Sequence, residues 1–107
     1  MLLKLQNPPL TLTREFLISH SWEFLHAEGD VISPQIRLDP SGTIRGLDHP
    51  NESRWGMEGG KLVFYHVSGV PATRFYEMRY EDGKIVLSGR LLLPGHQAIV
   101  IHVLKEL

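Results

Sequence analysis

Residues 72–93 read ATRFYEMRYEDGKIVLSGRLLL, and this stretch decides the fold. Two runs rich in β-branched, aromatic and aliphatic residues flank the turn sequence Glu-Asp-Gly at residues 81–83, a combination typical of a β-hairpin. In the second run every other position is apolar or glycine: Ile85, Leu87, Gly89, Leu91 and Leu93. A central glycine gives a tightly curved sheet the room it needs. We therefore predict two antiparallel strands joined by a tight turn.

The first run of this hairpin alternates less cleanly. Side chains of a regular strand point to opposite faces in turn. The two faces would carry mixed sets: Thr73, Phe75, Glu77 and Arg79 on one, and Arg74, Tyr76, Met78 and Tyr80 on the other. Because neither face is wholly polar, we expect the strand to be curved, bulged or exposed to water on one side.

The same pattern of β-prone runs separated by turn residues continues along most of the chain. Turn-forming Gly, Pro, Asn and Asp recur at short intervals, and between them lie eight β-prone runs: 21–26, 32–39, 43–47, 53–57, 61–67, 72–80, 84–93 and 97–105. Short strands joined by tight turns favour a sandwich or a barrel. Closing a meander removes exposed sheet edges. We predict an all-β fold, an eight-stranded antiparallel up-and-down barrel.

The segment before the first strand predicts a short N-terminal helix. Thr11 or Thr13 can cap a helix, and apolar residues follow at helical spacing up to about residue 20. With 107 residues the chain is long enough for one domain, residues 1–107, in which residues 1–10 are the most peripheral part.

Composition excludes several classes of function. Hydrophobic residues make up 42% and charged residues 21% of the chain, and no apolar run approaches the roughly 20 residues needed to span a bilayer. The net charge of -1, without a basic stripe, predicts no nucleic-acid partner. The chain has no cysteine, which suits a reducing compartment, and its N-terminus is a poor signal peptide. We expect a cytoplasmic protein without a membrane partner.

The short helix, the strand SWEFLH at residues 21–26 and the hairpins that follow resemble the calycin barrels, the group of the lipocalins and the avidin-like proteins. In that group an early Trp packs across one end of the barrel, a place that Trp22 would hold. The Gly-X-Trp of lipocalins is absent, because His20 and Ser21 precede Trp22. The resemblance therefore implies the architecture alone.

The run from residue 42 to residue 75 also resembles a small bacterial module of unsettled function, sometimes found beside glycan-processing or glycosyltransferase domains. The shared residues are Gly42, Ile44, Gly46, His49, Pro50, Asn51, Glu52, Trp55, Gly60, Leu62, Thr73 and Phe75. They lie within about a third of the chain. The module implies no catalytic chemistry for this protein.

Residues 49–55, HPNESRW, are the main candidate for a site. One interpretation is purely structural, because Asn and Ser side chains bond local backbone and Pro50 fixes a turn dihedral. The other is a recognition rim, in which His49, Asn51 and Glu52 supply polar groups and Trp55 a stacking surface. These residue types suit a sugar or a small polar molecule.

Further candidates lie on the strand after residue 71. Arg74, Tyr76 and Tyr80 would line a pocket together with Trp55 if that strand turned this face into the barrel, and Arg74 could hold an anionic group there. No metal site, cofactor or catalytic group is predicted. The six histidines lack ligand spacing, and no nucleophile or phosphate loop is present.

Together these patterns favour a non-catalytic binding module for a small molecule or glycan in the barrel. A protein-interaction or accessory module with a packed interior is the alternative, and an enzyme is the third. A ligand-binding barrel should have a cavity with convergent polar groups, whereas an accessory module should have a packed interior and an exposed apolar patch. The sequence leaves the ligand, the partner and the oligomeric state open.

Overall fold

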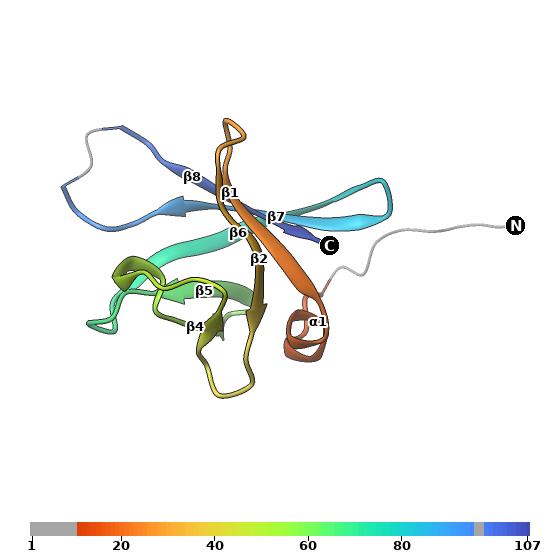
Figure 1. Ribbon diagram of the computed structural model, residues 1–107, viewed down its shortest axis with the longest axis horizontal. Helices are drawn as coiled ribbons and strands as arrows, with labels where there is room; N and C mark the ends of the chain where they lie inside the picture. Colours follow the sequence, from red (N-terminus) through yellow and green to blue (C-terminus); the bar gives the residue numbers. More distant parts are fainter. Residues whose placement is uncertain (1–10, 96–97) are drawn as a thin grey trace, which may run out of the picture.

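The computed structural model describes residues 11–95 and 98–107. Eight antiparallel strands form one sheet in the order β3-β2-β1-β8-β7-β6-β5-β4 (Figure 1). The elements are α1 (Arg14–Ser19), β1 (Ser21–His26), β2 (Val31–Leu38), β3 (Ile44–Arg45), the 3-10 helix η1 (Pro50–Glu52), β4 (Arg54–Glu58), β5 (Lys61–Tyr65), β6 (Pro71–Glu81), β7 (Lys84–Leu91) and β8 (Ile101–Glu106). The predicted strands and the short helix are confirmed. The predicted peripheral place of residues 1–10 lies outside the described residues.

The two ends of the sheet come together and nearly close the barrel. In the sheet order β3 and β4 are the outermost strands. An antiparallel bridge joins Thr43 to Arg54, and the Trp55 amide donates to the Gly42 carbonyl at 2.9 Å. Every other neighbouring pair is consecutive in sequence, apart from β1 with β8. The predicted up-and-down barrel is therefore confirmed.

The hairpin that decides the fold has the turn its sequence predicts. Glu81 pairs with Lys84 across β6 and β7, so only Asp82 and Gly83 form the connection. Their φ angles are 54° and 79°, the left-handed values that a two-residue I′ turn requires at both positions. Asp and Gly tolerate these values better than most residues, which explains the sequence at this point.

A β-bulge in β6 explains the irregular alternation of that strand. Phe75 pairs with Gly89 and Glu77 with Ser88, so Tyr76 is an extra residue opposite β7. Thr73 and Phe75 are buried before the bulge. After it Met78 packs against the same core as Phe75, although regular alternation would place the two on opposite faces.

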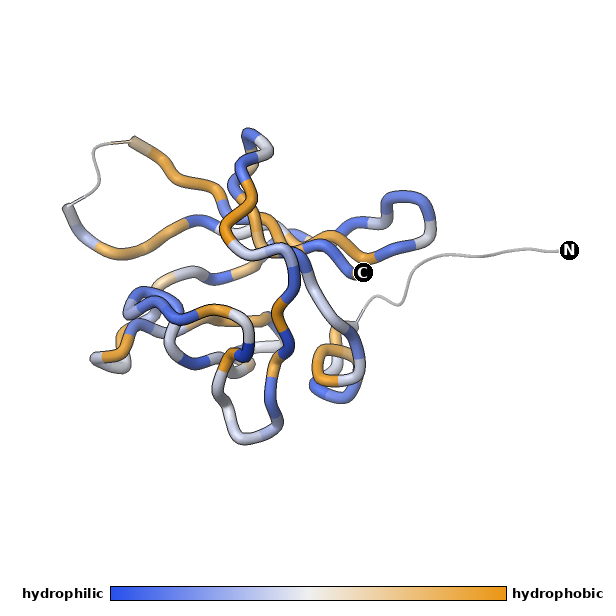
Figure 2. The backbone as a smooth tube through the Cα atoms, viewed as in Figure 1, coloured by the Kyte–Doolittle hydropathy of each residue, from blue (hydrophilic) through white to orange (hydrophobic). Residues whose placement is uncertain are grey.

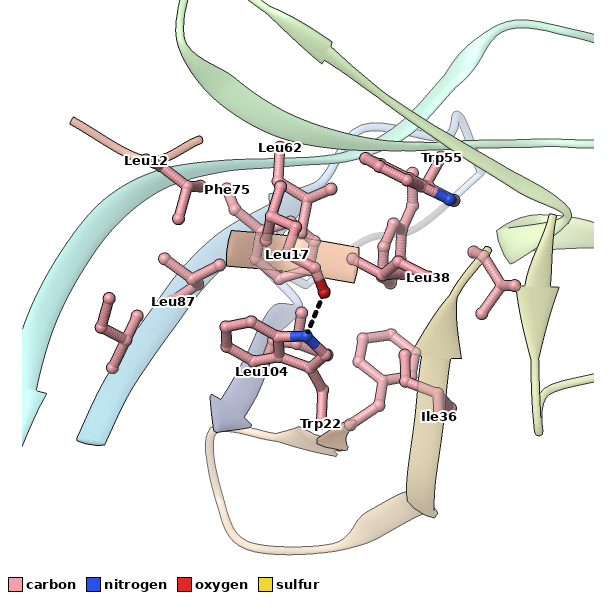
Figure 3. Packing of buried hydrophobic residues seen from close by; sticks show 14 residues of the cluster. Leu12, Leu17, Trp22, Ile36, Leu38, Trp55, Leu62, Phe75, Leu87 and Leu104 are labelled. Carbon is pink, nitrogen blue, oxygen red and sulfur yellow. Dashed lines mark hydrogen bonds between the residues drawn. The ribbon is translucent and has the colours of Figure 1, made fainter. Parts of the chain in front are cut away.

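The interior of the barrel is filled by side chains. Fourteen buried apolar residues form one cluster, with Trp22 among the largest (Figure 3). The Trp22 indole N–H donates to the Leu17 carbonyl of α1 at 3.0 Å (Figure 3). Thr13 caps α1 by accepting from the Phe16 amide at 3.1 Å. Helix α1 thus packs against the core. Hydrophilic turns, such as the one between β1 and β2, project from the barrel (Figure 2).

Candidate functional site

The His-Pro-Asn-Glu stretch folds into the 3-10 helix η1, held at both ends. Pro50 stands at its first position, where a missing amide hydrogen costs nothing. The His49 ring Nδ1 accepts a hydrogen bond from the backbone N–H of Asn51 at 3.1 Å. The backbone N–H of Glu52 donates to the His49 carbonyl at 3.2 Å. The Pro50 carbonyl accepts from the Val67 amide at 2.8 Å, which ties η1 to the turn between β5 and β6. Helix η1 is therefore a fixed platform.

This platform buries a carboxyl group. Glu52 is only 5% exposed, and its Oε2 has no hydrogen-bond partner among the described residues. Its Oε1 lies 3.8 Å from the His49 Nδ1. Burial raises the pKa of Glu52 above its ordinary value, and the nearby His49 and His26 offset part of that increase. A buried carboxyl with an unpaired oxygen is rare in a structural core and frequent in binding and active sites.

Glu52 lies in the wall of a cavity of about 240 Å³. The wall contains polar and aliphatic residues, and it draws on η1 and on four strands or their ends: His26, Ile32, His49, Asn51, Glu52, Leu91, Val100 and His102. Three sequence-predicted residues, His49, Asn51 and Glu52, thus lie in the wall of one cavity. Their role in binding stays a prediction.

Two histidines face the same cavity from neighbouring strands. His26 in β1 and His102 in β8 are directly paired in the sheet, with ring centroids 5.3 Å apart. His102 is buried, and its Nδ1 lies 2.9 Å from the Thr73 hydroxyl. This contact holds the His102 ring in place, because Thr73 is itself fully buried.

The Nδ1 atom of His49 already has a backbone hydrogen-bond partner. A ring nitrogen that accepts from a backbone N–H carries no proton, and Nδ1 of His49 accepts from Asn51. Nδ1 of His49 therefore does not donate a hydrogen bond to Oε1 of Glu52 in this geometry. No Lys or Arg belongs to the described lining of the cavity.

A second cavity of about 390 Å³ lies on the other side of Asn51. Its wall is formed by residues of the β5–β6 turn and of the segment after β7: Asn51, His66, Ser68, Val70, Leu93 and Pro94. Asn51 belongs to both cavities. The side chain of Asn51 makes no hydrogen bond to any described residue, so its side-chain amide is free to contact a ligand in either cavity.

Two of the sequence-predicted residues do not reach the cavity. Trp55 is 4% exposed and belongs to the core, with its indole N–H donating to the Asp39 carbonyl at 2.8 Å and the Arg14 guanidinium over its ring at 4.8 Å. It has no free face for stacking. Arg74 lies on the strand face opposite the buried Thr73, where it donates to Glu58 at 3.0 Å. The prediction that both residues line a pocket is wrong.

Tyr76 and Tyr80 are also outside the cavity. Tyr76 is the extra residue of the β-bulge and is 53% exposed, because the bulge turns it away from the core. Tyr80 is 38% exposed and pairs with Ile85 beside the β6–β7 turn. Leu91, which lines the cavity, is at the other end of β7. The prediction that these tyrosines line the interior is therefore wrong.

Sequence reasoning did not single out His26 and His102 as site residues. The signal was present in the alternation: Trp22 and Phe24 are buried on one face of β1, and His26 is the next residue on that face. His102 precedes the buried Leu104 in the same way on β8. A polar residue at the end of a series of inward-facing apolar residues indicates where the apolar core ends and the open end of the barrel lies.

In the described part of the chain, no group of three or more His, Asp or Glu side chains is arranged to hold a metal ion. None of the described helices has both the length and the apolar character needed to cross a bilayer. Comparisons with protein-family models, curated proteins and solved structures gave no match. A function for the chain is therefore inferred from its own geometry.

The buried carboxyl makes a specific prediction for stability. We expect Glu52→Gln to raise the free energy of unfolding at pH 7 by about 1 kcal/mol, because the neutral amide avoids the cost of burying an ionised carboxyl group. Because the folded-state pKa of Glu52 is raised above its ordinary value of 4.5, both states are protonated below that value. The penalty builds up as the pH rises above the unfolded-state value, and it is complete once the pH has passed the folded-state pKa. The gain should therefore vanish near pH 4 in urea unfolding.

Glu58→Gln is the matched control. Hydrogen bonds from Tyr65 and Arg74 lower the pKa of Glu58, so its contribution is present above its ordinary value and is lost as pH falls. This variant should not gain stability at pH 7. A Glu52→Gln variant that is less stable than the parent at pH 7 would show that the carboxylate is stabilising.

Proposed function

We propose that the chain is a non-catalytic binding protein that holds a small polar molecule, such as one sugar unit of a glycan, in the cavity beside η1. The observation that supports this proposal is the Glu52 carboxyl, buried in the cavity wall with one oxygen unpaired among the described residues. Leaving such a group without a partner costs about 1–3 kcal/mol. A ligand that donates a hydrogen bond to it would recover that free energy.

The position and size of the cavity limit the ligand. Because the core cluster fills the interior, the proposed site is at the mouth of the barrel rather than at its centre. The cavity volume of about 240 Å³ lies below the range of roughly 300–1,000 Å³ typical of drug-sized ligands. Aliphatic Ile32, Leu91 and Val100 offer apolar surface, and Asn51 and the histidines offer hydrogen bonds. A single ring with several polar substituents fits this mixed lining.

A second candidate function is a protein-interaction or accessory module. The packed interior favours it, and so do exposed apolar side chains close to the second cavity: Val67, Val70, Leu92 and Ile99. Such residues on turns are available to a partner. We rank it second because exposed apolar residues alone do not explain the buried, unpaired Glu52.

Two finer expectations belong to the same proposal. The meander order of the strands and the packed Trp22 support an architectural relation to the calycin barrels. The lack of cysteine supports action in the cytoplasm.

The binding proposal is tested by a screen of single sugars and a variant of Asn51. We expect ligand-observed NMR with glucose, galactose, mannose and glucosamine to detect binding of at least one. Asn51→Ala should then weaken that binding about tenfold, the effect of losing one or two hydrogen bonds. Its free energy of unfolding should change by no more than about 0.5 kcal/mol.

Tyr76→Ala is the control, because Tyr76 is exposed and outside the cavity. This variant should bind as the parent does. Failure of all four sugars to bind, or equal binding by the Asn51 variant, would count against a sugar-sized ligand in this cavity.

A further inference from the structure

We propose that the ligand of this cavity carries a protonated amine, which forms an ion pair with Glu52. This inference rests on the proposed function and names the chemical class of its ligand. It starts from a mismatch of charge: among the described residues Glu52 is the only buried Asp or Glu. The described lining of the cavity contains no Lys or Arg.

Two carboxylates elsewhere in the described chain are neutralised by arginine side chains. Asp39 accepts from Arg45 at 2.9 Å, and Glu58 accepts from Arg74 at 3.0 Å. Both lie in more exposed positions than Glu52, where water would solvate an unpaired charge at little cost. The carboxylate that most needs a cation is therefore the one without an Arg or Lys partner.

The neighbouring histidines His49 and His26 offset the burial of the Glu52 charge only in part. His49 accepts at Nδ1 from the Asn51 amide, which fixes the unprotonated form at the nitrogen closest to Glu52. His26 and His102 are paired across β1 and β8, and protonating both rings at a centroid distance of 5.3 Å would place two like charges together. The described lining therefore offers Glu52 no permanently charged Lys or Arg partner.

An amine suits this cavity better than a neutral hydroxyl group. A hydroxyl donates one hydrogen bond to the carboxylate but leaves its charge uncompensated. An ammonium group donates and also neutralises the charge, and charge-assisted hydrogen bonds are about twice as strong as neutral ones. The desolvation of Glu52 is already a cost of folding, so binding adds only the desolvation of the amine.

The rest of the lining describes the remainder of the ligand. Asn51 and the histidines can bond hydroxyl groups, while Ile32, Leu91 and Val100 present an apolar surface. Acidic ligands are disfavoured, because a second carboxylate beside Glu52 would repel it. A hydroxylated primary amine, such as an amino sugar with a free amino group, combines these features.

Three sugars built on the same ring test the inference. Glucosamine carries the amine, glucose has a hydroxyl in its place, and acetylation in N-acetylglucosamine removes the positive charge. At about pH 7 we expect calorimetric titration to give a dissociation constant for glucosamine about tenfold lower than for glucose, with N-acetylglucosamine no tighter than glucose. Glu52→Gln should reduce the preference for glucosamine to less than about twofold, while thermal unfolding checks that this isosteric variant is folded.

Glu58→Gln is the matched control, since Glu58 pairs with Arg74 outside the cavity. It should keep the full preference for glucosamine. If glucose binds as tightly as glucosamine, the amine inference is overturned and small-molecule binding still stands. If Glu52→Gln keeps the preference, the amine pairs elsewhere and the inference also fails. If none of the three sugars binds, both proposals fail.

Discussion

Replacing Trp22 by alanine should lower the free energy of unfolding by about 3–5 kcal/mol, the usual cost of removing a buried tryptophan. Trp22 is 0% exposed and packs within the main core cluster. Its indole N–H also holds the Leu17 carbonyl of α1 at 3.0 Å. The variant would therefore lose core packing and leave a buried carbonyl without its donor. Urea unfolding followed by circular dichroism measures the loss.

Trp22→Phe separates the two contributions. Phenylalanine retains much of the ring volume but cannot donate to Leu17, so we expect a smaller loss than for alanine, about 1–3 kcal/mol. Tyr76→Ala, an exposed aromatic position, should change stability by less than about 0.5 kcal/mol. Trp22→Ala with an unfolding free energy close to that of the parent would show that the indole is not part of the core.

Gly89→Ala should cost about 2–3 kcal/mol, at the upper end of the range for overpacking a well-filled site. A Cβ at Gly89 would lie 2.5 Å from the Arg74 carbonyl oxygen and 2.9 Å from the Thr73 Cγ2. The first neighbour is backbone of β6 next to the bulge, so relief requires the two strands to separate. The expected measurement is a lower midpoint in urea with an unchanged slope.

Gly56→Ala is the matched control, because Gly56 is also in a strand but has room. Its added Cβ would lie 3.4 Å from the Tyr65 Cε2, near ordinary contact distance. We expect a change of no more than about 0.5 kcal/mol. Equal effects at the two glycines would contradict the close approach of β6 and β7 at Gly89.

Much of this fold could be predicted from sequence because its determinants are local. The turn at Asp82 and Gly83 is specified by two residues that accept positive φ, and the strands on either side by their own side chains. The room required at Gly89 was also visible, as a glycine in the middle of an apolar strand face. These features depend on short-range geometry.

The site could be predicted only in part, because its members come from distant segments. Helix η1 brings His49, Asn51 and Glu52 together within four residues, which a sequence shows directly. His26 and His102 join them only through the pairing of β1 with β8. That contact is set by closure of the barrel and not by any local pattern.

The wrong predictions have two physical origins, one in β6 and one at Trp55. Period-two alternation assumes a regular strand, and the bulge between Phe75 and Glu77 breaks that period. Arg74 and Tyr76 were therefore predicted to face inward, whereas β6 presents Thr73 and Phe75 to the core. Trp55 was predicted at a rim because it follows a polar turn, but its ring is covered by Arg14 from α1.

The central claim is that the cavity beside Glu52 binds a small ligand, and the most direct test is an amide NMR titration with glucosamine. We expect saturable shifts at His26, Asn51, Glu52 and His102, which line the cavity, and no shifts in the β6–β7 hairpin around Asp82. The same titration of Glu52→Gln should give much weaker shifts at these positions. Saturable shifts confined to other surfaces, or none at the cavity, would contradict the claim.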